Sequence, residues 1–204
     1  MNWRATFRVK ASGTSFLPHD DFPMAYISPP IVPKISDKKM LSFCETICPD
    51  EKPFHVLVHP EPESIGLQCF QNVQKKVKKS GGYVVYGWDI CQLPKIHLEA
   101  TFHAIWQSND GRFVDVTPEA YGQTQILFLR DRHRTYNGQE VARHRFALGE
   151  RKLVERYWYL FDEYQRILAQ LLLAGFPRGD AIYEIRLGCM SEEMLKLTRK
   201  LNDA

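Results

Sequence analysis

Apolar side chains recur along this chain with two periods, and each period predicts a different kind of element. Short apolar or alternating runs that end in turn residues predict β-strands, expected at residues 54–59, 83–89, 96–107, 112–116 and 125–129. Apolar positions three and four residues apart predict helices, expected at residues 37–48, 67–80, 150–174 and 191–201. The last of these is expected to begin at Ser191, a residue type that caps helices well. This mixture of elements indicates an α+β fold.

The chain of 204 residues is long enough for one domain with its own core. We therefore expect a single domain over residues 1–204, made of three parts. Residues 1–62 hold nine of the twelve prolines and should form extended chain that wraps the rest, because proline is excluded from helix interiors and central strands. Residues 63–130 form a core that carries the candidate chemistry, and residues 150–204 form C-terminal helices.

The stretch from Leu98 to Pro118 predicts a β-hairpin whose turn is Asn-Asp-Gly at residues 109–111. In a three-residue loop the last position takes a left-handed glycine. That loop would pair Ile105 with Asp115 and His103 with Thr117. Because side chains alternate between faces, His103 and Asp115 would then share a face as diagonal neighbours, with Cβ atoms about 7 Å apart.

A two-residue turn at the same place leads to the opposite arrangement. It shifts the register by one residue and turns Asp115 away from His103. The sequence permits either loop. If Asp115 faces away, Thr117 is the remaining candidate partner of His103, and a triad becomes a dyad.

Cys69 is expected at the start of the helix that ends at Gly81-Gly82. Unpaired backbone N–H groups and the positive end of the helix dipole favour the ionised form of a thiol at such a position. Cys69, His103 and Asp115 thus supply a nucleophile, a base and a carboxylate that orients the base. Read singly, the three are as well explained as a core cysteine, a core histidine and a surface acid.

These residues resemble the transglutaminase-like branch of the papain-like superfamily. In that branch a helix-borne Cys precedes a strand that commonly reads H-A-W-V and a second strand that reads like W-V-x-V-D-P-T. Here residues 103–106 read H-A-I-W and residues 113–118 read F-V-D-V-T-P. The second strand is also similar to that of arylamine N-acetyltransferases, which ends in a V-D-V run. The resemblance implies a helix with its N-terminal Cys packed against a small antiparallel sheet.

Such a site implies a cysteine-dependent hydrolase or transferase that cleaves an amide through a thioester. Protease, amidase, deamidase and acyltransferase reactions all pass through that intermediate. The Cys69 backbone N–H and one side-chain donor would hold the oxyanion, with Gln68, Gln71 and Asn72 as candidates and Trp88 as a pocket wall. Asn72 is equally well explained as a structural amide. The chemistry requires no metal and no cofactor.

Composition and charge bear on the compartment and the partners of the protein. The net charge of +3 is weak, no apolar run reaches the roughly 18 residues of a membrane span, and the first residues lack the apolar core of a signal peptide. Five cysteines without an export signal favour a reducing compartment. We expect a cytoplasmic protein that acts on a protein or peptide rather than a small molecule, with neither a membrane nor a nucleic acid as partner.

Two other readings compete with the enzyme. Cys44, Cys48, His55 and His59 are residue types that bind zinc, although one strand would hold its two histidines about 13 Å apart. The lysines at residues 75–79 and the basic residues 130–145 could form a patch for nucleic acid, but no aromatic side chains are interleaved with them. The alternative function is therefore a non-catalytic protein- or nucleic-acid-binding module on the same scaffold.

Overall fold

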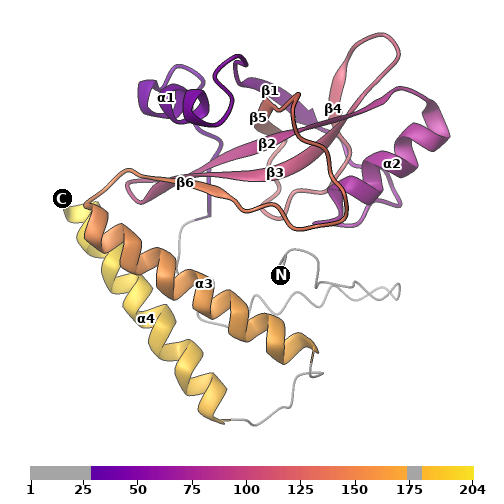
Figure 1. The fold of residues 1–204 in the computed structure, drawn as a ribbon. Coiled ribbons are helices and arrows are strands. Elements are labelled where there is room, and N and C mark those ends of the chain that lie inside the picture. The colour runs from indigo at the N-terminus through magenta and orange to yellow at the C-terminus, as the bar shows by residue number, and fades with distance from the viewer. Residues whose placement is uncertain (1–28, 174–180) are drawn as a thin grey trace. The chain divides into compact units, whose positions relative to one another are not determined.

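The structure, a computed structural model, describes residues 29–173 and 181–204 (Figure 1). The helices are α1 (Lys38–Ile47), α2 (Cys69–Ser80), α3 (Arg151–Leu173) and α4 (Ala181–Asp203). The strands are β1 (Phe54–Val58), β2 (Tyr83–Leu93), β3 (His97–Gln107), β4 (Phe113–Asp115), β5 (Gln125–Arg130) and β6 (His144–Ala147). The α+β class is as predicted. Most of the Pro-rich segment, residues 1–28, lies outside the described residues.

Five of the strands close into a barrel. The sheet order is β2-β5-β1-β4-β3-β6, and β2 also pairs with β3, so that only β6 stands outside the ring. The strand β1 runs antiparallel to β5 but parallel to β4, which makes the sheet mixed. The prediction of a small antiparallel sheet was wrong in this respect, because strands far apart in sequence need long connections to pair in parallel and leave no local signal.

The barrel closes around a small apolar core. Its buried members are Val56, Val85, Ile105, Ile126 and Phe128. A Cβ at Gly87 would lie 2.3 Å from the Leu129 carbonyl oxygen and 2.5 Å from the Phe128 ring. The absence of a side chain at residue 87 therefore lets β2 and β5 approach each other closely.

Interactions between residues close in sequence set the start of α1 and the end of α2. Asp37, expected near the start of this helix, caps α1: its side chain accepts hydrogen bonds from the N–H groups of Lys39 (2.8 Å) and Met40 (3.0 Å). The helix α2 ends at Gly81, whose φ is +70° and whose N–H donates to the Val77 carbonyl. At its other end, α2 begins at Cys69.

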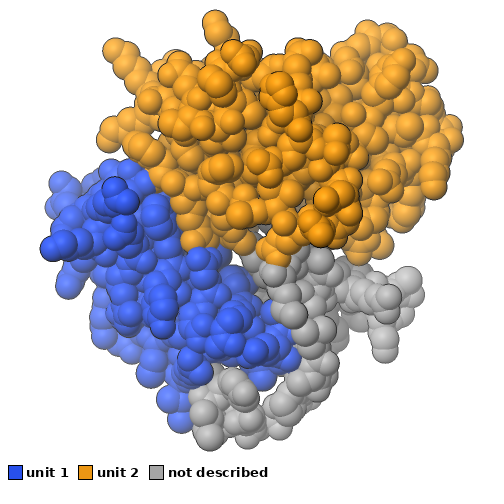
Figure 2. Space-filling view, viewed as in Figure 1, with its two compact units in different colours: residues 1–29, 94–97, 147–204 blue, residues 30–93, 98–146 orange. Residues whose placement is uncertain are grey.

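The chain divides into two compact units (Figure 2). One comprises Pro30–Leu93 and Leu98–Phe146, and the other comprises Met1–Pro29, Pro94–His97 and Ala147–Ala204. The first unit holds the barrel and both of the helices α1 and α2. The expectation of a single domain stays a prediction.

The second unit is built on α3 and α4. An ion pair between Arg156 and Glu193 (2.8 Å) links the two helices, and buried residues such as Leu160 and Met194 line their inner faces. The helix α4 begins well before Ser191, which lies buried inside it, so the predicted helix start there was wrong. Among the described residues, no helix has both the length and the apolar character that crossing a membrane requires.

Candidate active site

The loop of the hairpin decides which side chains face each other, and it has three residues. Trp106 pairs with Val114 and Gln107 with Phe113. The next pair is closed by the Ser108 N–H, which donates to the Arg112 carbonyl at 2.9 Å. Gly111 ends the loop with φ at +88°. Of the two loops that the sequence permits, the structure has the three-residue loop and the register that follows from it.

His103 and Asp115 accordingly share a face and form a hydrogen bond. His103 Nε2 lies 2.8 Å from Asp115 Oδ2, and the two residues are 3% and 0% exposed. The other carboxylate oxygen, Asp115 Oδ1, accepts a hydrogen bond from the backbone N–H of Thr117 at 2.9 Å. Both oxygens of the carboxylate are therefore held before any ligand arrives.

Cys69 is the third member of the cluster. Its side chain lies close enough to that of His103 to raise the pKa of the imidazole, and because Nε2 is bonded to Asp115, the ring nitrogen left for the sulfur is Nδ1. Two residues before it, Leu67 has φ at +69°, a left-handed conformation that is uncommon for a residue with a branched side chain. The chain thus turns sharply just before α2, and the structure brings Cys69, His103 and Asp115 together.

The charge of His103 is set by these neighbours. Burial is the largest effect and lowers the pKa of His103, but the negative charge of Asp115, the charge on the Cys69 sulfur and hydrogen bonds to both side chains raise it. The net result is a pKa well above the usual 6.5. These neighbours therefore favour the protonated, imidazolium form of His103.

The amide N–H groups of Asn72 already donate to other residues and are not available to an oxyanion. Its Nδ2 group donates to the Ile65 carbonyl at 2.8 Å and to Thr117 Oγ1 at 3.2 Å, and its Oδ1 accepts from the Ile65 N–H at 3.1 Å. The side chain is 2% exposed. Asn72 therefore ties the loop before α2 to the end of the hairpin, and its proposed place in the oxyanion site was wrong. The structural reading of this amide was the right one.

Trp88 is also not a wall of this site. Its indole N–H donates to Asp131 Oδ2 at 3.1 Å, and its ring lies 5.2 Å from that of Phe102. Phe102 and His103 are neighbours on a strand, so their side chains leave opposite faces. Trp88 thus packs on the face of β3 that points away from His103. The prediction failed because the sequence alone does not show on which face of β3 the Trp88 ring packs.

The remaining oxyanion candidates sit on either side of Cys69. Gln68 is half-buried and occupies the N-cap position of α2, where its side chain makes no capping hydrogen bond. Its role stays a prediction. Gln71 is exposed two residues after Cys69, where the helical turn carries it to another face.

Two contributors were not recognised in the sequence. Thr117 was considered only as a substitute for Asp115, yet its backbone N–H helps to hold that carboxylate. An Asp that bonds the N–H two residues onward is a common local pattern, so the Asp-Val-Thr run carried a usable signal. The second is Tyr136, whose ring lies parallel to that of Phe70 at 3.7 Å. No spacing pattern links residues so far apart.

The basic residues singled out in the sequence are largely ion-paired. Four arginines of residues 130–145 bind carboxylates, in the pairs Arg132–Glu51, Arg134–Asp131, Arg143–Glu99 and Arg145–Glu99. Lys76 and Lys79 both contact Glu61. Paired cations have less charge to offer a phosphate backbone, so this arrangement gives no support to a nucleic-acid surface.

The zinc reading gains no support either. Among the described residues, which include all four proposed ligands, no three His, Cys, Asp or Glu side chains are arranged to hold a metal ion. Burial raises the pKa of Cys44 to about 12 and that of Cys48 to about 11.

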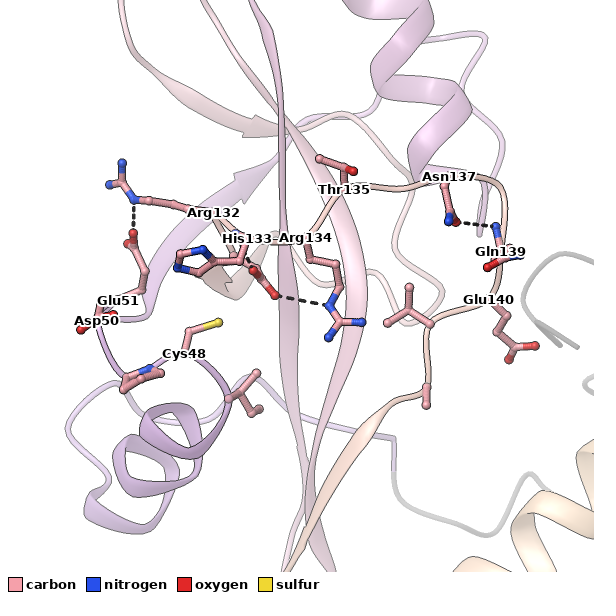
Figure 3. A pocket seen from close by; sticks show the side chains of 15 residues that line it. Cys48, Asp50, Glu51, Arg132, His133, Arg134, Thr135, Asn137, Gln139 and Glu140 are labelled. Carbon is pink, nitrogen blue, oxygen red and sulfur yellow. Dashed lines mark hydrogen bonds and ion pairs between the residues drawn. The ribbon is translucent and has the colours of Figure 1, made fainter.

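A polar cavity of about 730 Å³ lies elsewhere in the same unit, between residues 47–51 and residues 131–142 (Figure 3). Its lining carries charges of both signs, and two of its ion pairs, Arg132–Glu51 and Arg134–Asp131, are drawn in Figure 3. Residues 131–143, which connect β5 to β6 and are called the β5–β6 segment below, form much of its wall.

Comparisons of the chain with protein-family models, with curated proteins and with solved structures found no match. The geometry of the Cys69–His103–Asp115 cluster is therefore the basis for a function.

Proposed function

We propose that the protein is a cysteine-dependent enzyme that cleaves an amide bond through a thioester, on a papain-like or transglutaminase-like scaffold. The observation that carries this proposal is the buried bond between His103 Nε2 and Asp115 Oδ2, which leaves Nδ1 to Cys69. A nucleophile, a base and a group that orients the base are the parts such a reaction needs.

The first half of the reaction forms the thioester. The imidazolium of His103 favours the thiolate of Cys69, whose sulfur attacks the carbonyl carbon of the amide. The developing oxyanion lies near the first turn of α2, where backbone N–H groups have no partner within the helix. When the tetrahedral intermediate collapses, the carbon–nitrogen bond breaks and His103 gives its proton to the leaving amine.

The second half releases the acyl group. Neutral His103 takes a proton from water or from an acceptor amine, which then attacks the thioester and regenerates the Cys69 thiolate. Water makes the enzyme a hydrolase, and an amine makes it an acyltransferase or a cross-linking enzyme. Throughout, Asp115 keeps the ring in one orientation because Thr117 fixes the other oxygen of its carboxylate.

We further propose that the substrate is a protein or peptide and that the enzyme works in a reducing compartment such as the cytoplasm. None of the five cysteines, all within the described residues, forms a disulfide. A nucleophilic thiol is preserved in such a compartment, where thiols stay reduced. Hydrolytic and transfer reactions are equally compatible with the cluster.

The proposal is tested by alkylating the intact protein across a range of pH and locating each modified cysteine by peptide mass spectrometry. Cys69 should react at a pH well below about 8.5, where an ordinary thiol is mostly protonated, and should lose that reactivity in His103→Ala. Cys189, which is exposed, is the internal standard. If Cys69 and Cys189 titrate alike, the enzyme is excluded and the fold serves as a binding scaffold.

A further inference from the structure

The cluster at Cys69 is closed to solvent. Cys69 is 7% exposed and His103 is 3% exposed. An amide carbon must come within about 3–3.5 Å of the attacking sulfur, so some group has to move before a substrate can react. The question is which group moves, and what the substrate puts in its place.

The β5–β6 segment is packed directly against the start of α2. Figure 1 shows it running past the N-terminal end of this helix. The ring of Tyr136 lies over that of Phe70, with centroids 3.7 Å apart and planes 3° apart. Phe70 is the residue after Cys69 and is 8% exposed. Tyr136 therefore covers the first turn of the helix that carries the thiol.

The β5–β6 segment has the features of a part that can open. It is anchored near both ends, because the Asp131 N–H donates to the Tyr86 carbonyl at 3.0 Å and the arginines of the pairs Arg132–Glu51 and Arg143–Glu99 belong to it. Between these anchors it has no regular secondary structure, and the Gln139 N–H bonds within the segment, to Asn137. Gly138 has φ at +89° and open space around it. Segments with local bonding open at low free energy.

One face of this segment contacts α2, and the other lines a cavity. Thr135 and Asn137, the neighbours of Tyr136, line the cavity of about 730 Å³ (Figure 3). Tyr136 itself does not line this cavity. The segment therefore has open space against the two neighbours of Tyr136, and Phe70 against Tyr136.

An aromatic surface lies beneath Tyr136. The Phe70 ring has its centroid 5.8 Å from that of Phe102 and 6.3 Å from that of Tyr86. Removing Tyr136 would uncover the flat face of Phe70, the residue that follows Cys69 on α2. A planar ring is the shape that fills such a place, because offset stacking recovers the contact that Tyr136 gives up.

We propose that Tyr136 is a specificity-determining residue that closes the site in the absence of substrate and holds, on Phe70, the place of an aromatic side chain next to the scissile amide. This proposal rests on the proposed function of Cys69. An aromatic substrate displaces Tyr136 and stacks on Phe70 in its place, so one ring contact replaces another. A substrate without a ring must displace Tyr136 without recovering the free energy of the Tyr136–Phe70 contact.

The test compares two alkylating reagents, iodoacetamide and N-benzyliodoacetamide, by their rates at Cys69 in the full-length protein. In both, the sulfur displaces iodide, and only the second carries a ring. In Tyr136→Ala both rates should rise by about 2-fold to 10-fold. That is the factor by which one aromatic contact shifts the equilibrium towards the closed segment. The benzyl reagent should gain more than iodoacetamide, because the Phe70 face is free to bind it.

Three variants make the result specific. Tyr136→Phe keeps the ring and should react like the parent protein. Tyr159→Ala removes a tyrosine that is 60% exposed on α3 and should also change nothing. Phe70→Leu keeps an apolar side chain but no ring face, and should abolish the advantage of the benzyl reagent. Unchanged rates in Tyr136→Ala, or equal gains with both reagents, would overturn the proposal.

The same measurement separates this proposal from the function on which it rests. Adding His103→Ala to Tyr136→Ala should slow both reagents alike and leave their ratio unchanged. If His103→Ala has no effect on either rate, the catalytic cluster is refuted. The ratio of the two reagents in Tyr136→Ala still decides whether Tyr136 shields Cys69 and selects a ring.

Discussion

Asp115→Asn replaces one carboxylate oxygen at the centre of the cluster with an amide NH2 group and leaves the packing intact. An asparagine can still accept the Thr117 N–H through Oδ1, but it presents an amide N–H group where Oδ2 stood. His103 Nε2 must then accept this hydrogen bond, so the neutral ring carries its proton on Nδ1. That nitrogen faces Cys69 and can no longer take a proton from the thiol.

The structure sets the size of the effect. The variant exchanges a charge-assisted hydrogen bond, worth about 1.5–3 kcal/mol, for a neutral one of about 0.5–1.5 kcal/mol. We expect a loss of about 1–2 kcal/mol in the free energy of unfolding. The equivalent substitution in a Ser-His-Asp triad lowers kcat by about 10⁴, through the same reversal of the tautomer. The folded state should therefore survive while the reactivity does not.

Three measurements check this prediction. The alkylation rate of Cys69 near pH 6 should fall at least about tenfold, towards that of an ordinary thiol. The side-chain ¹⁵N signals of His103 should move from a doubly protonated ring to one protonated at Nδ1. Urea unfolding should report the modest loss of stability. Asp110→Asn makes the same chemical change on the exposed hairpin loop and is the matched control.

One outcome would refute the reasoning. If Asp115→Asn keeps the reactivity of Cys69 at low pH while its His103 signals shift as expected, the orientation of the imidazole does not control the thiol. Cys69 would then owe its reactivity to the helix start alone.

Three further outcomes follow from the same contacts. Asn72→Ala removes the bonds that hold Ile65 and should lower the free energy of unfolding by about 2–4 kcal/mol; a loss under about 1 kcal/mol by urea titration would contradict this role. Gly111→Ala places a Cβ in the left-handed region and should cost about 1 kcal/mol, with hydrogen exchange still reporting the three-residue loop. The pKa of His103 is higher in the folded than in the unfolded chain, so its contribution to stability is complete below about pH 6.5 and is lost as pH rises through the folded pKa. The difference in urea stability between the parent and His103→Gln should shrink over that rise, and a constant difference would argue against it.

The sequence predicts best what is decided locally. Asp37 caps α1 through bonds to N–H groups two and three residues away, and Gly81 ends α2 with a positive φ. These two parts required no knowledge of the rest of the chain. The hairpin is local only in part, because the sequence permits a two-residue or a three-residue loop, and the loop length sets which residues of the two strands face each other.

The sequence predicts poorly what depends on partners far away. The face on which Trp88 packs is decided by Phe102 and Asp131, which belong to β3 and to the β5–β6 segment. The amide of Asn72 is used up by Ile65 and Thr117, the latter 45 residues onward. Composition and spacing identify such side chains as candidates, but only their tertiary partners decide between a structural and a functional role.

The strand β1 shows how such a distant partner supports the candidate site. A strand was expected at residues 54–59, yet nothing in the sequence indicated that this strand runs parallel to β4. In that position the His59 N–H donates to the Asp115 carbonyl at 2.8 Å, while the other edge of β4 pairs with β3. The backbone of Asp115 is thus held from both sides, and its carboxylate is held by His103 and Thr117. A buried carboxylate is costly unless its oxygens are hydrogen-bonded, as both are here. The strands on both sides of β4 hold the backbone from which this carboxylate reaches His103.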